Sequence, residues 1–176
     1  KNLVKILRYK DKSFYDGLNY AITFAKGRYI GILNSGDIYF NDTVLDKVKK
    51  KVKNLDFIFG NISFYNHKNE ITRNWNLNFL PKKKIFFHLI AHSSLFISLD
   101  IMKNYLKNYN LKYKIASDTD LIIRLNLLKN IRFKKIDDYL VFMKTGGLST
   151  NYRFFFKKFV EDLSIINSYF GYKFFL

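Results

Sequence analysis

The sequence has no cysteine, which excludes disulfide bonds, a thiolate nucleophile and a cysteine-ligated zinc site. Its longest apolar stretch, residues 85–99, is interrupted by two histidines and three serines and is too short and too polar to span a bilayer. No Walker-type phosphate loop and no Gly-x-Ser-x-Gly nucleophile elbow occurs. We therefore expect no transmembrane helix, and the lack of cysteine suits a reducing cytoplasm.

Acidic residues are scarce: 14 Asp and Glu face 31 Lys and Arg, for a formal net charge of +17. Such a charge favours a polyanionic partner, either nucleic acid or an anionic membrane surface. The competing interpretation is the residue usage of an AT-rich genome, which the spread of lysine over most segments supports. Residues 152–160 mix cations with aromatics, as interfacial helices do, so we expect peripheral membrane contact and no nucleic acid.

Apolar residues make up 48% of the 176 residues and aromatics 19%, which predicts a globular chain with its own core. Helical spacing and turn residues predict the elements in the following order. Helices are expected at 13–25, 42–54, 99–108, 117–129 and 152–169; strands are expected at 29–33, 56–65, 93–98, 131–136 and 139–143; and residues 66–78 are expected to be irregular. This alternation is typical of an α/β fold with a mostly parallel sheet.

The strand at 29–33 ends in Asn34-Ser35-Gly36-Asp37. These residues form turns readily, so an ordinary turn is one interpretation. Ligands of open α/β sheets, however, gather where strands end, and a divalent cation shared with a diphosphate needs only one or two protein carboxylates. Asp37 is therefore a candidate metal ligand.

A second acidic segment is Ser117-Asp118-Thr119-Asp120, at the start of a predicted helix. Ser117 and Asp120 fit a capping box, which leaves Asp118 free to act as a general base. His88 and His92 have the spacing of a zinc-protease motif, but Leu89 stands where that motif requires glutamate, so we expect no zinc site. The single tryptophan, Trp75, is either a core residue or a platform for stacking a sugar, and the core is favoured.

Five blocks now resemble one family in order and spacing. They are "KDKSFYDGLNYAITFAKGRYIGILNSGDIYF", "DFIFGN", "AHSSLFIS", "YKIASDTDLIIRL" and "VFMKTGGLST". They resemble the blocks "EPDxGIYDAMNKGIxxAxGxxIxFLNSDD", "DxIYGD", "HQSxFF", "YxIASDYDLxLRL" and "FxxGGxS" of bacterial family-2 glycosyltransferases, which build O-antigen, capsule and related glycans. The resemblance implies a GT-A-like, Rossmann-related α/β fold with a mixed, mostly parallel sheet flanked by helices.

The resemblance also implies roles for individual residues. Asp37 matches the family's ligand for Mn2+ or Mg2+, and Asp118 matches the general base that deprotonates the acceptor hydroxyl in inverting transfer. The donor side comprises Asp11, Asp16, Asn19, Asn34 and Gly36, with Gly36 standing where many members have a ribose-binding Asp. The acceptor and sugar side comprises His92, Gly146 and Gly147. The implied substrates are a nucleoside-diphosphate sugar and a glycan or lipid-linked acceptor, used in the cytoplasm or at the cytoplasmic face of the inner membrane.

One departure concerns the start of the chain. Family members begin with a strand resembling "xSVIxPxYN", and no such segment precedes Lys10. We therefore expect residues 1–150 to be a partial, N-terminally incomplete catalytic domain that retains the metal and base regions, and residues 151–176 to be a C-terminal basic-aromatic helix. A catalytically inactive remnant and a non-enzymatic basic module that binds nucleic acid or a membrane surface remain the alternatives.

Overall fold

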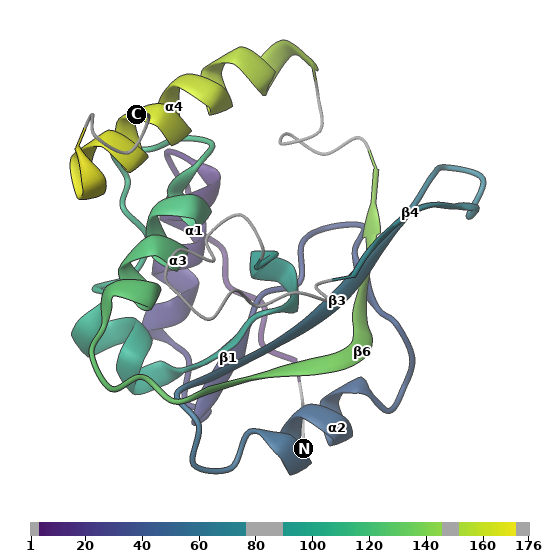
Figure 1. Ribbon diagram of the computed structural model, residues 1–176. Coiled ribbons are helices and arrows are strands. Elements are labelled where there is room, and N and C mark those ends of the chain that lie inside the picture. The colour runs from purple at the N-terminus through teal and green to yellow at the C-terminus, as the bar shows by residue number, and fades with distance from the viewer. Residues whose placement is uncertain (1–3, 77–89, 146–151, 172–176) are drawn as a thin grey trace.

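The computed structural model describes residues 4–76, 90–145 and 152–171 (Figure 1). The helical elements are α1 (Phe14–Thr23), α2 (Val44–Lys51), the 3-10 turn η1 (His92–Ser94), the π-helical turn η2 (Ile101–Tyr105), α3 (Ser117–Leu127) and α4 (Tyr152–Phe170). The strands are β1 (Tyr29–Gly31), β2 (Ile38–Tyr39), β3 (Phe57–Tyr65), β4 (Ile71–Trp75), β5 (Phe96–Ser98) and β6 (Phe133–Lys144).

The strands form one mixed sheet in the order β1-β5-β3-β6-β2, with β4 paired to β3 as a hairpin. β3 and β6 form the long parallel pair at its centre. The other described pairings, β1–β5, β3–β5, β2–β6 and β3–β4, are antiparallel. The predicted α/β architecture with a mixed sheet is therefore confirmed, and parallel pairing is confined to this central pair.

Each face of the sheet carries its own apolar core because side chains alternate along β3. Phe57 and Phe59 pack on one face with residues of α1, α3 and α4. Ile58 and Ile62 pack on the opposite face with the buried valines of α2. Figure 1 shows the same division, with α1, α3 and α4 on one side of the sheet and α2 on the other. Fully burying one such side chain contributes about 1.5–3 kcal/mol.

The predicted helix spacing is confirmed in α3, where Leu121, Ile122 and Leu125 are all buried. Helical spacing within residues 13–25 predicts that Phe14 lies on the apolar face of α1 and Tyr15 on the polar face. The structure differs, because Phe14 is 42% exposed and Tyr15 only 3% exposed. The sequence also predicts a capping box from Ser13 to Asp16, and Ser13 does cap α1, because its Oγ accepts a hydrogen bond from the Asp16 N–H at 3.2 Å.

Two other predictions are wrong in part, and a third element is shorter than predicted. Residues 66–78 are not irregular throughout, because β4 lies within them. The two strands expected at 131–136 and 139–143 are one strand, β6, whose register against β3 shifts around Gly60 and Asn61. The helix expected at 99–108 is present but shorter, because the helical residues are 99–105 and Ile101–Tyr105 form the π-helical turn η2. Trp75 packs against both cores, as its preferred interpretation required.

In the described part of the chain, no helix has both the length and the apolar character needed to cross a membrane.

Candidate active site

Asp37 lies in the turn that follows β1 and is only 8% exposed. The turn is closed by a hydrogen bond from the Asp37 N–H to the Asn34 carbonyl at 3.0 Å. Gly36 has φ +88, and a Cβ at this position would lie 3.2 Å from Lys144 Cδ, so both conformation and space favour glycine here. The turn therefore holds the Asp37 carboxylate in a buried position, where neighbouring groups can make fixed contacts with it.

The two oxygens of Asp37 have different surroundings. Oδ1 accepts the backbone N–H of Lys144, the last residue of β6, at 3.0 Å. Oδ2 is buried and has no hydrogen-bond partner among the described residues. Burial raises the pKa of Asp37, and the opposing effects of the Lys144 N–H, the Asn34 side chain and His92 only partly offset it. Oδ2 is thus a buried acceptor to which none of the described residues donates.

Asp118 lies in the first turn of α3, with its side chain 24% exposed. Oδ1 accepts hydrogen bonds from the Thr119 N–H at 2.9 Å and the Tyr15 hydroxyl at 3.1 Å. Oδ2 lies 3.3 Å from His92 Nδ1. Burial acts to raise the pKa of Asp118, but the hydrogen bond and charge of His92, aided by Lys158 and the Thr119 N–H, bring that pKa below its ordinary value. Asp118 is therefore ionised at neutral pH.

His92 contacts Asp118, and the next residue, Ser93, contacts the end of β6 that also bonds Asp37. His92 begins η1, contacts Asp118 through Nδ1, and is also among the groups whose charge acts on Asp37. The predicted site residues Asp37, Asp118 and His92, which are far apart in the sequence, are therefore grouped in space. Gly146 and Gly147, predicted on the acceptor side, lie outside the described residues.

The start of α3 is not held by the predicted capping box. Ser117 Oγ donates to the Asn110 carbonyl at 2.8 Å, and Asp120 is bonded to Arg124 and to the Tyr169 hydroxyl. The donors that precede α3 are satisfied by Glu161 of α4. Its carboxylate accepts the backbone N–H groups of Lys114, Ile115 and Ala116 at 3.2, 2.8 and 3.0 Å respectively. Burial and Asp120 raise the pKa of Tyr169 to about 12, so its hydroxyl stays a donor.

The predicted donor-side residues on α1 make contacts within the fold. Asn19 donates to the Tyr109 carbonyl at 2.9 Å and accepts the Tyr109 N–H at 2.8 Å, so both ends of its amide are engaged. Asp16 Oδ2 accepts the Lys12 N–H at 2.9 Å. Asp11 lies against Gly17, where an added Cβ would be 2.7 Å from Asp11 Oδ2. Their roles toward a donor stay predictions.

Sequence reasoning missed two residues that fix the base. Tyr15 holds Asp118 directly, and Glu161 holds the backbone before it. The family block quoted above has a tyrosine at the Tyr15 position, which was an available signal. Nothing in the local sequence marks Glu161, because its partners lie more than 40 residues away.

The residues at Asp37 fit a divalent cation held jointly with a substrate. Asp37 Oδ2 and Asn34 Oδ1 are buried oxygens without a hydrogen-bond partner in the described ranges, and oxygen ligands suit Mg2+ and Mn2+. The described part of the chain contains no group of three or more His, Cys, Asp or Glu side chains that could hold a metal alone. A metal here would therefore take its remaining ligands from substrate oxygens and water.

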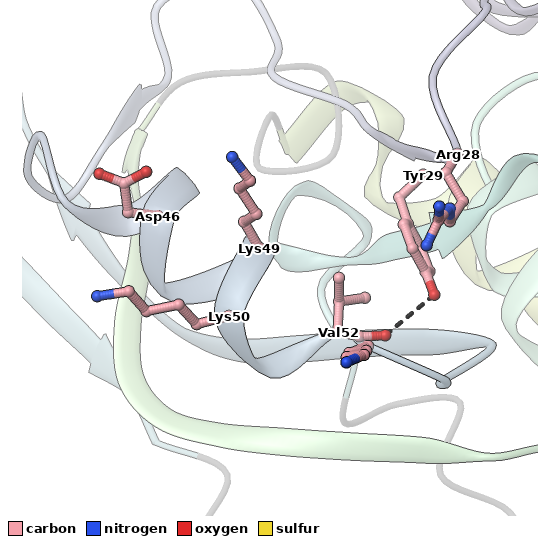
Figure 2. Close-up of a pocket in the computed structure, with 7 residues that line it drawn as sticks. Arg28, Tyr29, Asp46, Lys49, Lys50 and Val52 are labelled. Atoms are coloured by element: carbon pink, nitrogen blue, oxygen red, sulfur yellow. Dashed lines mark hydrogen bonds between the residues drawn. The ribbon is translucent and has the colours of Figure 1, made fainter.

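A separate hollow of about 630 Å3 lies at the other end of β1, away from Asp37. It is lined by Arg28, Tyr29, Asp46, Lys49, Lys50, Val52 and Lys53 (Figure 2). The Tyr29 hydroxyl donates to the Val52 carbonyl at 3.0 Å, while Lys49 and Lys50 point away from each other. The diverging lysines do not form a convergent binding site.

No family model matches the chain. An uncharacterized glycosyltransferase, MJ1057, of Methanocaldococcus jannaschii is 29% identical over 131 residues, which cover 70% of this chain and 44% of the relative.

Among solved structures, residues 1–349 of S. aureus TarS superpose with a TM-score of 0.62 at 13% identity, covering 89% of this chain and 45% of that one. The complex of the same TarS region with UDP-GlcNAc gives a TM-score of 0.61, also at 13% identity, covering 85% and 45%. The chain thus spans less than half the length of these relatives. It shares the fold of the TarS region and is similar in sequence to a glycosyltransferase.

Proposed function

We propose that the chain carries the catalytic region of a metal-dependent, inverting glycosyltransferase of family 2. The proposal rests mainly on two carboxylates from distant segments. Asp37 has a buried oxygen without a hydrogen-bond partner among the described residues, and Asp118 is ionised, partly exposed and in contact with His92. The similarity to an archaeal glycosyltransferase and to the TarS fold supports the same class.

In the proposed mechanism Asp118 accepts the proton of an acceptor hydroxyl as that oxygen attacks the anomeric carbon of the donor. The bond from that carbon to the diphosphate breaks on the opposite face, so the configuration inverts. Tyr15 and Thr119 keep the base in one orientation through their bonds to Oδ1. Asp37 would hold Mn2+ or Mg2+, which when bound offsets the charge that develops on the departing nucleoside diphosphate.

A nucleoside-diphosphate sugar is the proposed donor. TarS structures with UDP and with UDP-GlcNAc have the same fold, which supports this substrate class. The proposed acceptor is a glycan or lipid-linked glycan in surface polysaccharide synthesis, of which O-antigen is one kind.

A lipid-linked acceptor agrees with the surface of α4. Phe155 and Phe156 are 69% and 73% exposed, and Phe159 and Val160 are also exposed, beside exposed Lys157. Large exposed apolar side chains mixed with lysine suit an anionic membrane surface. The proposed location is therefore the cytoplasmic face of the inner membrane.

The test is sugar transfer with Mn2+ and a panel of nucleoside-diphosphate sugars, measured as release of the nucleoside diphosphate. Donor concentrations must be high because the resemblance predicts weak nucleotide binding by this chain. Asp118→Asn and Asp37→Asn should each lower the rate about 100-fold or more. Asp46→Asn, an exposed aspartate of α2, is the matched control and should keep the wild-type rate.

Near-normal transfer by either site variant would show that the role assigned to that residue is wrong. If the wild-type chain releases no nucleoside diphosphate from any donor, the enzymatic proposal fails for this chain and the inactive alternative is favoured.

A further inference from the structure

Three unsatisfied acceptors are concentrated around Asp37. Six buried side-chain atoms have no hydrogen-bond partner among the described residues, and three of them are Asn34 Oδ1, Asp37 Oδ2 and His92 Nε2. The first two are oxygens that only accept. His92 Nδ1 lies 3.3 Å from Asp118 Oδ2, and in the neutral tautomer that carries its proton on Nδ1, Nε2 is an acceptor as well.

The contacts of β6 show that these acceptors share one neighbourhood. At the end of this strand, the Lys144 N–H donates to Asp37 Oδ1 at 3.0 Å. The preceding residue, Met143, accepts a hydrogen bond through Sδ from the Ser93 hydroxyl at 3.2 Å, and Ser93 follows His92 in η1. The turn of Asp37 and the start of η1 therefore contact adjacent residues at the end of β6.

A buried cluster of acceptors without a donor is unfavourable, because each atom has lost its water without gaining a partner. A divalent cation reverses this, since it binds carboxylate oxygen, amide oxygen and neutral imidazole nitrogen together. Histidines that bind metals usually donate their other ring N–H to a carboxylate, which fixes the tautomer and the orientation of the ring. Asp118 holds His92 in this way.

We propose that His92 Nε2 is a second protein ligand of the divalent metal beside Asp37, oriented by Asp118, and that the site prefers Mn2+ to Mg2+. This inference rests on the proposed function, which supplies the metal, and goes beyond it by assigning a nitrogen ligand. The preference follows from ligand chemistry: imidazole nitrogen suits transition metals, whereas Mg2+ favours oxygen alone. Asp118 then has two tasks, as base toward the acceptor and as positioning residue toward His92.

The experiment measures Mn2+ binding rather than activity. The chain is titrated with Mn2+ alone and with Mn2+ plus UDP, with bound metal followed by electron paramagnetic resonance. Pulsed spectra then report whether an imidazole nitrogen is bonded directly to the Mn2+. His92→Asn is the test variant, because an asparagine amide can replace the Nδ1–H donor to Asp118 while removing Nε2. His67→Asn, at an exposed position in the turn between β3 and β4, is the matched control.

We expect the imidazole signal in the wild type and in His67→Asn, and its loss in His92→Asn. The Mn2+ dissociation constant of His92→Asn should rise about tenfold or more, with a smaller change for Mg2+ in competition. The wild-type spectrum does not depend on the folding of any variant. Its lack of a nitrogen signal on bound Mn2+ would overturn the inference, as would unchanged Mn2+ binding by a folded His92→Asn.

Asp37→Asn separates this inference from the proposed function. If this variant loses Mn2+ while His92→Asn binds as the wild type does, His92 is not a ligand and the metal role of Asp37 survives. If Asp37→Asn binds Mn2+ normally, the metal role in the proposed function is wrong. A wild-type chain that binds no Mn2+, with or without UDP, would overturn both.

Discussion

Replacing Glu161 with alanine should destabilise the protein more than any ordinary surface substitution. The Glu161 carboxylate is the acceptor for three consecutive backbone N–H groups immediately before α3, at 2.8 to 3.2 Å. The N-cap residue of α3, Ala116, makes no side-chain cap hydrogen bond. In the variant, these three donors lose their partner at a place where two of them are partly buried.

The magnitude follows from these bonds. A hydrogen bond to a charged group contributes about 1.5–3 kcal/mol, and bonds that share one carboxylate are not additive. Water can replace the carboxylate at the more exposed Lys114 N–H. We therefore expect a loss of about 3 kcal/mol in the free energy of unfolding.

Urea unfolding followed by circular dichroism measures this loss. With an m-value of about 2 kcal/mol per M, the midpoint should fall by about 1.5 M. The matched control is Glu70→Ala in the β3–β4 turn, where the glutamate bonds only the neighbouring Asn66, and its change should be below about 0.5 kcal/mol. Equal midpoints for Glu161→Ala and Glu70→Ala would refute the reasoning, because Glu161 would then not hold the start of α3.

Two further changes test the packing and the surface. Gly60→Ala places a Cβ 2.6 Å from Leu140 Cγ and should cost about 1–3 kcal/mol in the same urea assay; an unchanged midpoint would mean that β3 and β6 are not this close. Phe156→Glu should weaken co-sedimentation with phosphatidylglycerol vesicles about tenfold, because it removes an exposed apolar side chain and adds a negative charge. The control Leu45→Glu on α2 should not weaken it. Equal binding by both variants would count against membrane contact through α4.

Much of the fold could be predicted because local patterns determine it. The apolar spacing of α3 and the continuous apolar run of β3 predict which side chains are buried, and Ser13 is a local signal for the start of α1. β4 was missed because most of its side chains are exposed, so it shows no alternating apolar pattern. Its pairing with β3 stabilises it instead.

The candidate site was only half predictable for a related reason. Asp37 and Asp118 are each marked by a local signal in the sequence: Asp37 follows the end of a strand, and Asp118 lies at the start of a helix. The partners that fix them are not local: the Lys144 N–H lies 107 residues from Asp37, and the Tyr15 hydroxyl lies 103 residues from Asp118. A backbone N–H carries no sequence signal, and only the tyrosine of the family block marks Tyr15.

The hydrogen bond from the Lys144 N–H to Asp37 connects the predicted metal site with the predicted acceptor side. Lys144 ends β6, and the chain continues from it into the pair Gly146-Gly147, predicted to face the acceptor. A ligand that displaces this end of β6 therefore also displaces the carboxylate predicted to hold the metal. Thermodynamic linkage then requires the effect to be mutual: whatever factor the acceptor imposes on metal affinity, the metal imposes on acceptor affinity. An order of substrate addition can arise from this single backbone hydrogen bond.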